Sequence, residues 1–376
     1  MFTQEQVLIA ETAANFARDV LAPGAARRDR EKLIEPEVFA DMAKLGFLGM
    51  TVPEHLGGVG ADYVSYALAL MAVASGDGAV STMMSVHNAP FNLILERFGS
   101  DDQQERILRP AAGGNFIGAF ALTESNAGSD ASALRSRAVR IGDRYVVNGS
   151  KEFITSGKIA GWTILFASMD GSGKAGITAF ITPTDAKGYQ VAKVEDKLGQ
   201  RASDTCSLRF DELEIPAENR IGEEGQGYRI ALSALEAGRI GIAAQSVGMA
   251  QAAFDLAVAY AKDRTAFGKC LMEHQAVAFR LAELRTTLEA ARQLVLNAAR
   301  LKDEGQPCLT EAAMAKLFAS EAAERVVSGA LQTFGGYGYI SELPVERIYR
   351  DVRVCQIYEG TSDIQKIIIA RALGSP

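Results

Sequence analysis

The chain has 376 residues, of which 48% are hydrophobic and 23% are charged, a composition typical of a globular protein with a substantial core. At this length about two or three domains are expected. The formal net charge of −7 argues against a sequence-independent nucleic-acid binder, because such proteins need a basic surface, but it leaves room for a small anionic ligand at a local basic site.

Residues 1–117 are predicted to form an N-terminal helical domain. Apolar residues recur there at the spacing of one helix face, and breaks containing glycine or proline separate the segments. Asp101 can cap the last of these helices, which runs to Leu108. The expected helical segments cover residues 7–17, 37–48, 63–74, 80–98 and 101–108.

The pattern changes over residues 118–227. Short runs rich in β-branched and aromatic residues alternate there with turns that contain Gly, Ser, Pro or Asp. We therefore predict a small middle β domain, either a barrel or a sandwich. The expected strands cover residues 145–147, 162–167, 177–181, 189–192 and 206–210.

Residues 228–376 return to helices, which are long, rich in Ala, Leu and Glu, and joined by short loops. This pattern predicts a C-terminal four-helix bundle. The expected fold class is therefore α+β and multidomain, in the order α, β, α. The predicted helices cover residues 228–261, 275–302, 309–334 and a shorter segment after Glu359.

The cysteines and histidines do not predict a metal site or a disulfide framework. Four cysteines are scattered without a Cys-x-x-Cys motif, and the three histidines lie far apart. We also expect no membrane span, because no apolar run looks long enough, and no signal peptide precedes the first helix. The expected location is the cytoplasm of a bacterial-type cell, or the mitochondrial matrix in a eukaryote.

The turn at Glu359 is a candidate catalytic site. Glu359 is a lone carboxylate between apolar residues and Gly360, which lets the chain bend, and residues 361–363 can cap the next helix. A carboxylate lifted out of water on such a turn has a raised pKa and suits a general base. On these residues alone, an exposed Glu beside a helix N-terminus is the alternative.

Two further segments combine hydroxyl groups, small residues and aromatic rings. In residues 120–130 a strand leads into a turn with free amides, suited either to a phosphate or polar ring edge or to an ordinary Asx-type turn. In residues 151–157, Phe153 and Thr155 stand two apart and should face the same side of a strand. They would place a ring and a hydrogen bond against a planar cofactor, or be a core Phe and a solvated Thr.

Five motifs in this order resemble those of the acyl-CoA dehydrogenase family. The resemblance covers essentially the whole chain and includes the α, β, α order. It is strongest to the short-chain (butyryl-CoA) branch, with some likeness to the isobutyryl-CoA branch. The motifs are residues 120–130, Lys151-Glu-Phe-Ile-Thr-Ser-Gly157, Asp263-Arg-Thr-Ala-Phe-Gly268, Leu331-Gln-Thr-Phe-Gly-Gly336 and Ile357-Tyr-Glu-Gly-Thr-Ser362.

The resemblance implies an FAD cofactor, a CoA thioester substrate and a homotetramer arranged as a dimer of dimers. One implied set lines the flavin or flanks its ring, and Thr361 and Asp363 touch the cofactor after the turn. A second set reaches the FAD of a neighbouring subunit. The first set is Phe120, Leu122, Thr123, Gly128, Ser129, Phe153 and Thr155, and the second is Arg264, Phe267, Gln275, Gln332, Gly335 and Gly336.

Glu359 matches the family's catalytic base. The resemblance implies that Glu359 removes the α-proton while flavin N5 takes the β-hydride, and that the Glu359 amide and a ribityl hydroxyl stabilise the enolate charge. In isovaleryl-CoA dehydrogenases the base lies instead just before the arginine that Arg239 matches, and Gly238 occupies that place here. The implied substrate-binding residues are Ser129, Glu236, Arg239, Tyr358 and Gly360.

Three departures from the family pattern matter. Residues 125–126 are Ser-Asn where Pro-Gly is usual, Phe153 replaces a usual tryptophan, and Glu236 stands where Asp is common. The first changes loop stiffness, the second reduces stacking area, and the third puts the exact CoA contact in doubt. For Arg239 and Arg264, an ion pair with a nearby acid on the helix surface is the alternative role.

The expected function is FAD-dependent α,β-dehydrogenation of a short-chain acyl-CoA, straight or branched, to a trans-2-enoyl-CoA, with electrons passing to an electron-transfer flavoprotein. The alternatives are an isobutyryl- or 2-methylbutyryl-CoA dehydrogenase of amino-acid catabolism, an oxidase that uses oxygen, and a catalytically silent acyl-CoA-binding scaffold. The acyl group is left open, because its pocket depends on side chains within residues 84–95 and 241–247.

Overall fold

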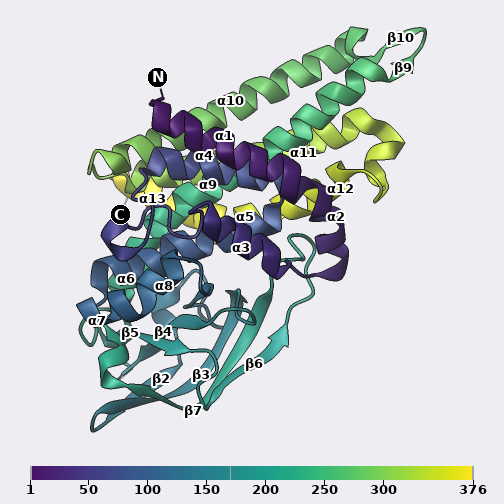
Figure 1. Cartoon of the computed structure of the whole chain (residues 1–376). Helices are drawn as coiled ribbons and strands as arrows, with labels where there is room; N and C mark the ends of the chain where they lie inside the picture. The colour runs from purple at the N-terminus through teal and green to yellow at the C-terminus, as the bar shows by residue number, and fades with distance from the viewer. Residues whose placement is uncertain (1, 170, 375–376) are drawn as a thin grey trace.

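The computed structural model describes residues 2–169 and 171–374. Figure 1 shows a helical layer, in which the N-terminal and C-terminal helices pack together, above a β-sheet. Along the chain the elements follow as helices, strands and helices again. The predicted α, β, α fold class is therefore confirmed.

The N-terminal region is helical, as predicted, and its apolar helix α4 is buried on almost every side. The helix expected over residues 80–98 is a continuous run of α5, a π-helical segment and α6. The last short helix is capped by Ser100 rather than Asp101, because Ser100 Oγ accepts from Gln103 N at 3.2 Å. The helices are α1 Gln4–Phe16, α2 Ala22–Glu31, α3 Pro36–Lys44, α4 Tyr63–Gly76, α5 Gly78–Val86, α6 Leu93–Phe98, α7 Asp101–Gln103 and α8 Arg109–Ala112.

The middle strands join into one mixed sheet of eight strands among the described residues, in the order β6-β7-β3-β2-β4-β5-β8, with β1 parallel to β4. All five predicted strands are present. Strand β2 was not predicted, because it carries two arginines and buries only Ala138. The strands are β1 Gly118–Ala121, β2 Arg137–Ile141, β3 Arg144–Thr155, β4 Trp162–Ser168, β5 Ile177–Pro183, β6 Tyr189–Val194, β7 Thr205–Pro216 and β8 Arg220–Ile221.

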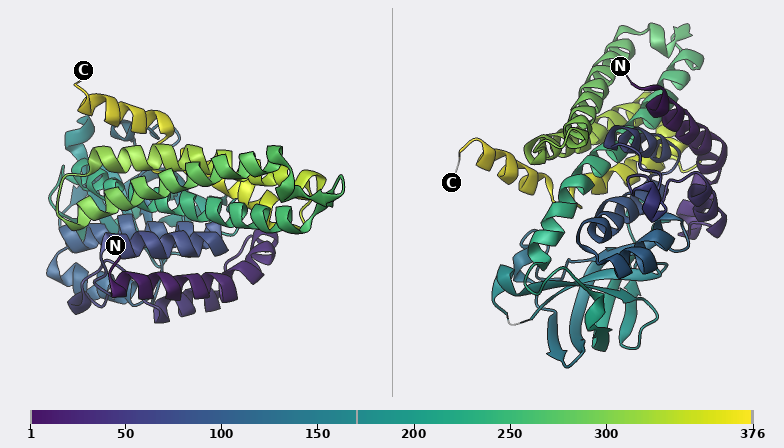
Figure 2. Two further views of the ribbon diagram at one scale, coloured as in Figure 1. Left: turned by 90° about the horizontal axis from the view of Figure 1, so that it is seen from above. Right: turned by 60° about the vertical axis from the view of Figure 1, so that its left-hand side comes forward.

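Three long helices dominate the C-terminal region, and Figure 2 shows α10 and α11 lying nearly parallel to one another. A short hairpin of β9 and β10, which the sequence indicated only as a break at Gly268, joins α9 to α10. Figure 1 shows that this hairpin projects at the end of the helices that is farthest from the sheet. The elements are α9 Gly227–Asp263, β9 Thr265–Ala266, β10 Lys269–Cys270, α10 Gln275–Asp303, α11 Leu309–Phe334, α12 Pro344–Val352 and α13 Ser362–Ala372.

Helix α9 is the central helix of the fold, and every residue from 237 to 250 is buried. Glycines let neighbouring backbones approach, since a Cβ built at Gly248 would lie 2.1 Å from Met71 O of α4. By length and composition α9 would be apolar enough to cross a membrane, but 67% of that window is buried inside the protein. The prediction that no apolar run is long enough was therefore wrong for α9, and its burial identifies it as a core helix of the fold.

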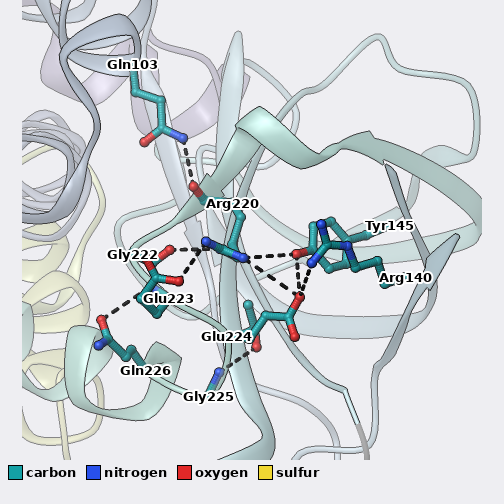
Figure 3. A network of polar contacts seen from close by, with 10 residues as sticks. Gln103, Arg140, Tyr145, Arg220, Gly222, Glu223, Glu224, Gly225 and Gln226 are labelled. Carbon is teal, nitrogen blue, oxygen red and sulfur yellow. Dashed lines mark hydrogen bonds and ion pairs between the residues drawn. The ribbon is translucent and has the colours of Figure 1, made fainter. Parts of the chain in front are cut away.

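Polar contacts attach the start of α9 to the sheet and to the N-terminal helices (Figure 3). Gln103 Nε2 donates to Arg220 O at 2.9 Å, and the Arg220 guanidinium pairs with Glu223 at 2.8 Å. Tyr145 of β3 donates to Glu224 at 2.7 Å. These bonds fix the position at which α9 begins. They therefore also fix where the later residues of α9 lie relative to the other helices.

Candidate functional site

Glu359 lies on a tight turn before α13. Its φ is +54° and that of Gly360 is +87°, so two consecutive residues adopt left-handed backbone conformations. For a residue with a side chain this conformation costs roughly 1–2 kcal/mol, so surrounding contacts must hold it. Thr361 caps the next helix by accepting from Ile364 N at 3.4 Å. The predicted turn and cap are confirmed.

The Glu359 carboxylate points at Gly238 of α9. A Cβ built on Gly238 would lie 2.6 Å from Glu359 Oε2, so a larger residue at 238 would displace the carboxylate from this position. Oε2 is buried and has no hydrogen-bond partner among the described residues. Burial raises the pKa of Glu359 to about 7, against the opposing positive charges of Arg239 and Lys316. Within the described part of the chain, the carboxyl group therefore has one buried oxygen without a partner and a pKa that suits a general base.

Arg239 lies one residue further along α9 and is only 5% exposed. Its Nε and Nη1 have no hydrogen-bond partner within the described part of the chain. Burial lowers its pKa, while Glu359 and Glu236 raise it, and it remains a cation at neutral pH. The surface ion pair that was the alternative for Arg239 is not formed, and its donors remain available to a ligand.

Tyr358 is held by a polar cluster that joins all three parts of the chain. Its hydroxyl donates to Gln245 Oε1 of α9 and accepts from Gln200 Nε2, in the loop between β6 and β7, at 3.3 Å. Gln200 is also bonded to Thr82 of α5 and to Asp351 of α12. Tyr358, predicted to contact substrate, therefore also anchors the Glu359 turn.

Glu236 is already paired in the structure. Its Oε1 accepts from Lys302 Nζ at 2.9 Å and from Cys308 Sγ at 3.5 Å. The Lys302 ammonium also lies 5.2 Å from the ring of Tyr63. The extra methylene of Glu relative to Asp gives the carboxylate its reach to these partners.

The loop at residues 120–130 is tied to β3 by a buried ion pair. Lys151 Nζ donates to Glu124 Oε1 at 2.8 Å and to Leu122 O at 3.0 Å, with both charged side chains almost fully buried. Beyond this anchor, Gly128 and Ser129 are exposed, while Leu122 is buried. The loop therefore presents its glycine and hydroxyl on a rigid base.

A β-bulge in β3 turns Phe153 outwards. The pairing with β7 shifts between Lys151 and Ile154, and Phe153 itself has a φ of +60°. Lys151 and Ile154 are buried, whereas the Phe153 ring is 66% exposed. Simple alternation from Lys151 would bury Phe153, so the exposed ring near Thr155 depends on the bulge. The alternative of a core Phe is thereby excluded.

The residues expected to reach a neighbouring subunit gather at the far end of the helices. Arg264, Gln332, Gly335 and Gly336 line one cleft of about 590 Å³. Phe267 stands on the β9–β10 hairpin with 98% of its surface exposed, and Gln275 opens α10. Figure 1 places this end away from the sheet, so the chain does not bring these residues to the 120–130 loop.

Two buried contacts at the Glu359 turn were not predicted from the sequence. Lys316 of α11 donates to Gly360 O at 2.7 Å, and Gln365 of α13 donates to the same oxygen at 2.8 Å. A signal for Lys316 was present, because a lysine interrupts an alanine-rich face of its helix. No signal marked Gln200 or Gln245, whose contacts depend on how the chain packs.

The family models match nearly the whole chain. The N-terminal, middle and C-terminal domains of acyl-CoA dehydrogenase match residues 3–115, 119–213 and 225–374. The mitochondrial short-chain specific acyl-CoA dehydrogenase of Rattus norvegicus is 45% identical over 364 residues, which cover 96% of this chain and 88% of that protein. The chain therefore belongs to the acyl-CoA dehydrogenase family. It is an oxidoreductase that uses FAD.

Solved structures agree with this assignment. Butyryl-CoA dehydrogenase from Megasphaera elsdenii has a TM-score of 0.98 and 42% identity, covering 100% of this chain and 99% of that chain. A chain from a study of the electron transferring flavoprotein of Acidaminococcus fermentans has a TM-score of 0.98 and 43% identity, with coverage of 99% and 98%. A similar glutaryl-CoA dehydrogenase from Mycobacterium smegmatis, with a TM-score of 0.95 and 30% identity, covers 100% of this chain and 96% of that chain and was solved with FADH2.

The residues of this chain fit FAD. Phe153 offers an exposed ring, and a Cβ built at Gly128, Gly335 or Gly336 would meet nothing within 4 Å, so these backbones are open to a ligand. Gly128 lies in the 120–130 loop beside the sheet, whereas Gly335 and Gly336 line the cleft at the far end of the helices. This split fits a cofactor that lies between two copies of the chain.

Proposed function

We propose that this chain dehydrogenates a short-chain acyl-CoA between its α and β carbons, with Glu359 as the base that removes the α-proton. The observation that carries the proposal is the Glu359 carboxylate, whose Oε2 is buried, has no hydrogen-bond partner among the described residues and faces Gly238. A base needs a free lone pair and a pKa near the working pH, and burial raises the pKa of Glu359 to about 7. Gly238 leaves the isovaleryl-type position without a carboxylate.

The chain's residues divide the remaining tasks. The bound flavin supplies the acceptor for the β-hydrogen, which leaves as hydride. The Glu359 amide donates to the thioester carbonyl, where charge develops as the α-proton leaves. Tyr358 and Gly360 lie beside the thioester, while Arg239 and Glu236 contact the CoA part. Closure of the site by substrate excludes water, which strengthens Glu359 as a base.

The close approach of α9 to α4 and α5, next to the Glu359 carboxylate, supports a short acyl group. Gly241 lies on the same face of α9 as Gly238, and a Cβ there would lie 2.7 Å from Ser85 Oγ of α5 and 3.2 Å from Tyr66 OH of α4. One turn further, Gln245 and Tyr358 are bonded together. Short-chain names among the relatives agree with this restriction.

The proposed assembly is a homotetramer, a dimer of dimers, in which the cleft lined by Arg264 and Gln332, together with the nearby Phe267 and Gln275, binds part of the FAD of a neighbouring subunit. The separation of this cleft from the sheet supports the arrangement. An electron-transfer flavoprotein is the proposed electron acceptor. The domain limits 1–117, 118–227 and 228–376 remain a prediction.

The direct test is Glu359→Gln. The amide keeps the shape of the side chain but cannot take a proton, so the variant should purify with bound flavin while anaerobic bleaching by butyryl-CoA slows by about 10²–10⁴-fold. Glu342→Gln, at an exposed position, is the matched control and should bleach at the parent rate. Bleaching of Glu359→Gln at the parent rate would exclude Glu359 as the base.

The same assay ranks the substrates. Butyryl-CoA should bleach the parent flavin faster than octanoyl-CoA, with isobutyryl- and 2-methylbutyryl-CoA testing the branched alternatives. Purified protein that holds flavin but is bleached by none of them would favour the silent acyl-CoA-binding scaffold.

A further inference from the structure

Lys316 is a buried lysine to which the reaction as described assigns no task. It lies in the middle of α11, is 0% exposed, and is surrounded on its helix by buried alanines such as Ala315 and Ala319. Removing an ammonium from water costs several kcal/mol unless partners compensate. No carboxylate of the described residues lies within ion-pair distance of Lys316. The burial of a charged lysine at this position therefore needs an explanation.

Hydrogen bonding alone does not supply that reason. Lys316 Nζ donates to Gly360 O at 2.7 Å, but Gln365 Nε2 donates to the same oxygen at 2.8 Å and to Glu359 O at 3.3 Å. The carbonyl would thus keep a donor without the lysine. A neutral side chain in place of Lys316 would avoid the cost of burying a charge.

The charge of Lys316 acts on Glu359 instead. The groups that face the carboxylate are Arg239 from α9, Tyr66 from α4 and Lys316 from α11, and Cys355 also interacts with the lysine. Burial lowers the pKa of Lys316 to about 8, opposed mainly by Cys355 and Glu359, so the group stays mostly protonated at neutral pH. Two cations therefore flank the base, and of these only Lys316 also holds the turn.

We propose that Lys316 is a positioning residue for the catalytic turn: its buried ammonium holds the left-handed Glu359–Gly360 pair from the side of α11 and keeps a positive charge beside the carboxylate. Arg239 is assigned to binding the CoA part of the substrate. Lys316 has no such role, so its charge acts only on the Glu359 carboxylate and its turn. This inference rests on the proposed role of Glu359.

Three variants separate geometry from charge. Lys316→Met removes the donor and the charge, Lys316→Gln keeps an amide donor without the charge, and Gln365→Leu removes the other donor and leaves the charge. Arg325→Met, on the exposed side of the same helix, is the matched control. Each is compared with the parent in steady-state turnover of butyryl-CoA between pH 5.5 and 9, with an artificial electron-acceptor dye that reoxidises the flavin, as kcat and KM.

Both neutral variants of Lys316 should move the acid limb of the kcat profile upward by roughly one pH unit, because loss of a nearby cation raises the pKa of the base. Near pH 6 kcat should fall about tenfold and recover above pH 8, with KM nearly constant. Gln365→Leu should lower kcat at every pH without moving the limb, and Arg325→Met should match the parent.

A second readout does not depend on the flavin. Thermal unfolding of Lys316→Met, of Glu359→Gln and of the double variant forms a double-mutant cycle. If the ammonium supports the ionised carboxylate, replacing Lys316 should lower Tm more at pH 8 when Glu359 is present than when Gln replaces it. A purely structural lysine would give the same loss in both backgrounds.

The outcomes distinguish this inference from the function on which it rests. Parent-like pH profiles for both Lys316 variants, with Glu359→Gln inactive, would overturn the inference and leave Glu359 as the base. Parent-like bleaching by Glu359→Gln would instead overturn the proposed function. A loss of Tm or flavin content without a shift of the limb would make Lys316 structural only.

Discussion

At the scale of single residues, the site depends on a carboxyl group that its surroundings leave unsatisfied. Glu359 has a strained backbone and a buried oxygen that no described residue pairs with, and Gly238 keeps the facing space open. Each feature costs stability and has a use only in binding or catalysis. Stability and activity should therefore respond in opposite directions to changes at this residue.

The pH dependence of stability tests this opposition. The pKa of Glu359 is raised to about 7 from its ordinary value of 4.5, so the folded chain holds the proton more tightly than the unfolded chain does. Ionisation in the folded chain therefore costs stability, a cost absent below pH 4.5 and complete above pH 7. Glu359→Gln lacks this cost and should gain about 1–3 kcal/mol relative to the parent between pH 5 and pH 8. Tm scans across this range measure it, and a constant difference would contradict the buried ionisation.

At the scale of elements, the 120–130 loop and the β3 bulge were predicted only in part. The sequence indicated a strand that leads into a polar turn, which β1 and the exposed Gly128 and Ser129 bear out. It did not indicate the Glu124–Lys151 ion pair, because residues 27 positions apart in the sequence meet only when the chain is folded. Nor did it indicate that a bulge turns Phe153 outwards, since a one-residue register shift leaves no mark in composition.

The buried pair makes a prediction for Lys151→Met. This change leaves the Glu124 carboxylate buried without its cation, which should destabilise the protein by about 3–5 kcal/mol and release flavin as the loop loosens. The double variant with Glu124→Gln should recover part of the Tm, because no charge is then left buried. Lys193→Met, which breaks an exposed pair with Glu195, should shift Tm little. An unchanged Tm in Lys151→Met would show that the pair does not anchor the loop.

At the scale of the whole molecule, the predicted cofactor residues fall into two groups that lie in separate regions of the folded chain. The 120–130 loop is tied to strand β3 of the sheet, whereas the β9–β10 hairpin projects at the end of the helices that is farthest from the sheet (Figure 1). Figure 2 shows the same elongated arrangement of helices, with α13 projecting from the body. This division supports the proposed assembly, in which a second copy of the chain completes the FAD site.

This arrangement predicts that flavin retention depends on assembly. Arg264→Ala should weaken FAD binding by roughly 1–3 kcal/mol, and flavin should be lost on dilution in parallel with dissociation of the oligomer. Arg285→Ala, at an exposed position of α10, is the control and should retain flavin. Sedimentation followed at the protein and flavin wavelengths measures both. Full flavin content in a monomeric Arg264→Ala protein would refute a shared site.

The sequence by itself determined the order of the three regions, the limits of the long helices and the turn that carries Glu359. These features depend on local periodicity, on capping residues such as Thr361 and on glycines that allow a bend. Each of these signals is contained within a short stretch of sequence. Only the tertiary structure decided that the Glu359 carboxylate is buried against Gly238 and that Lys316 and Gln365 hold its turn. Gln365 is local, but Gly238 and Lys316 lie about 120 and about 40 positions from the turn, and the energies of their contacts depend on the low-dielectric interior that packing creates.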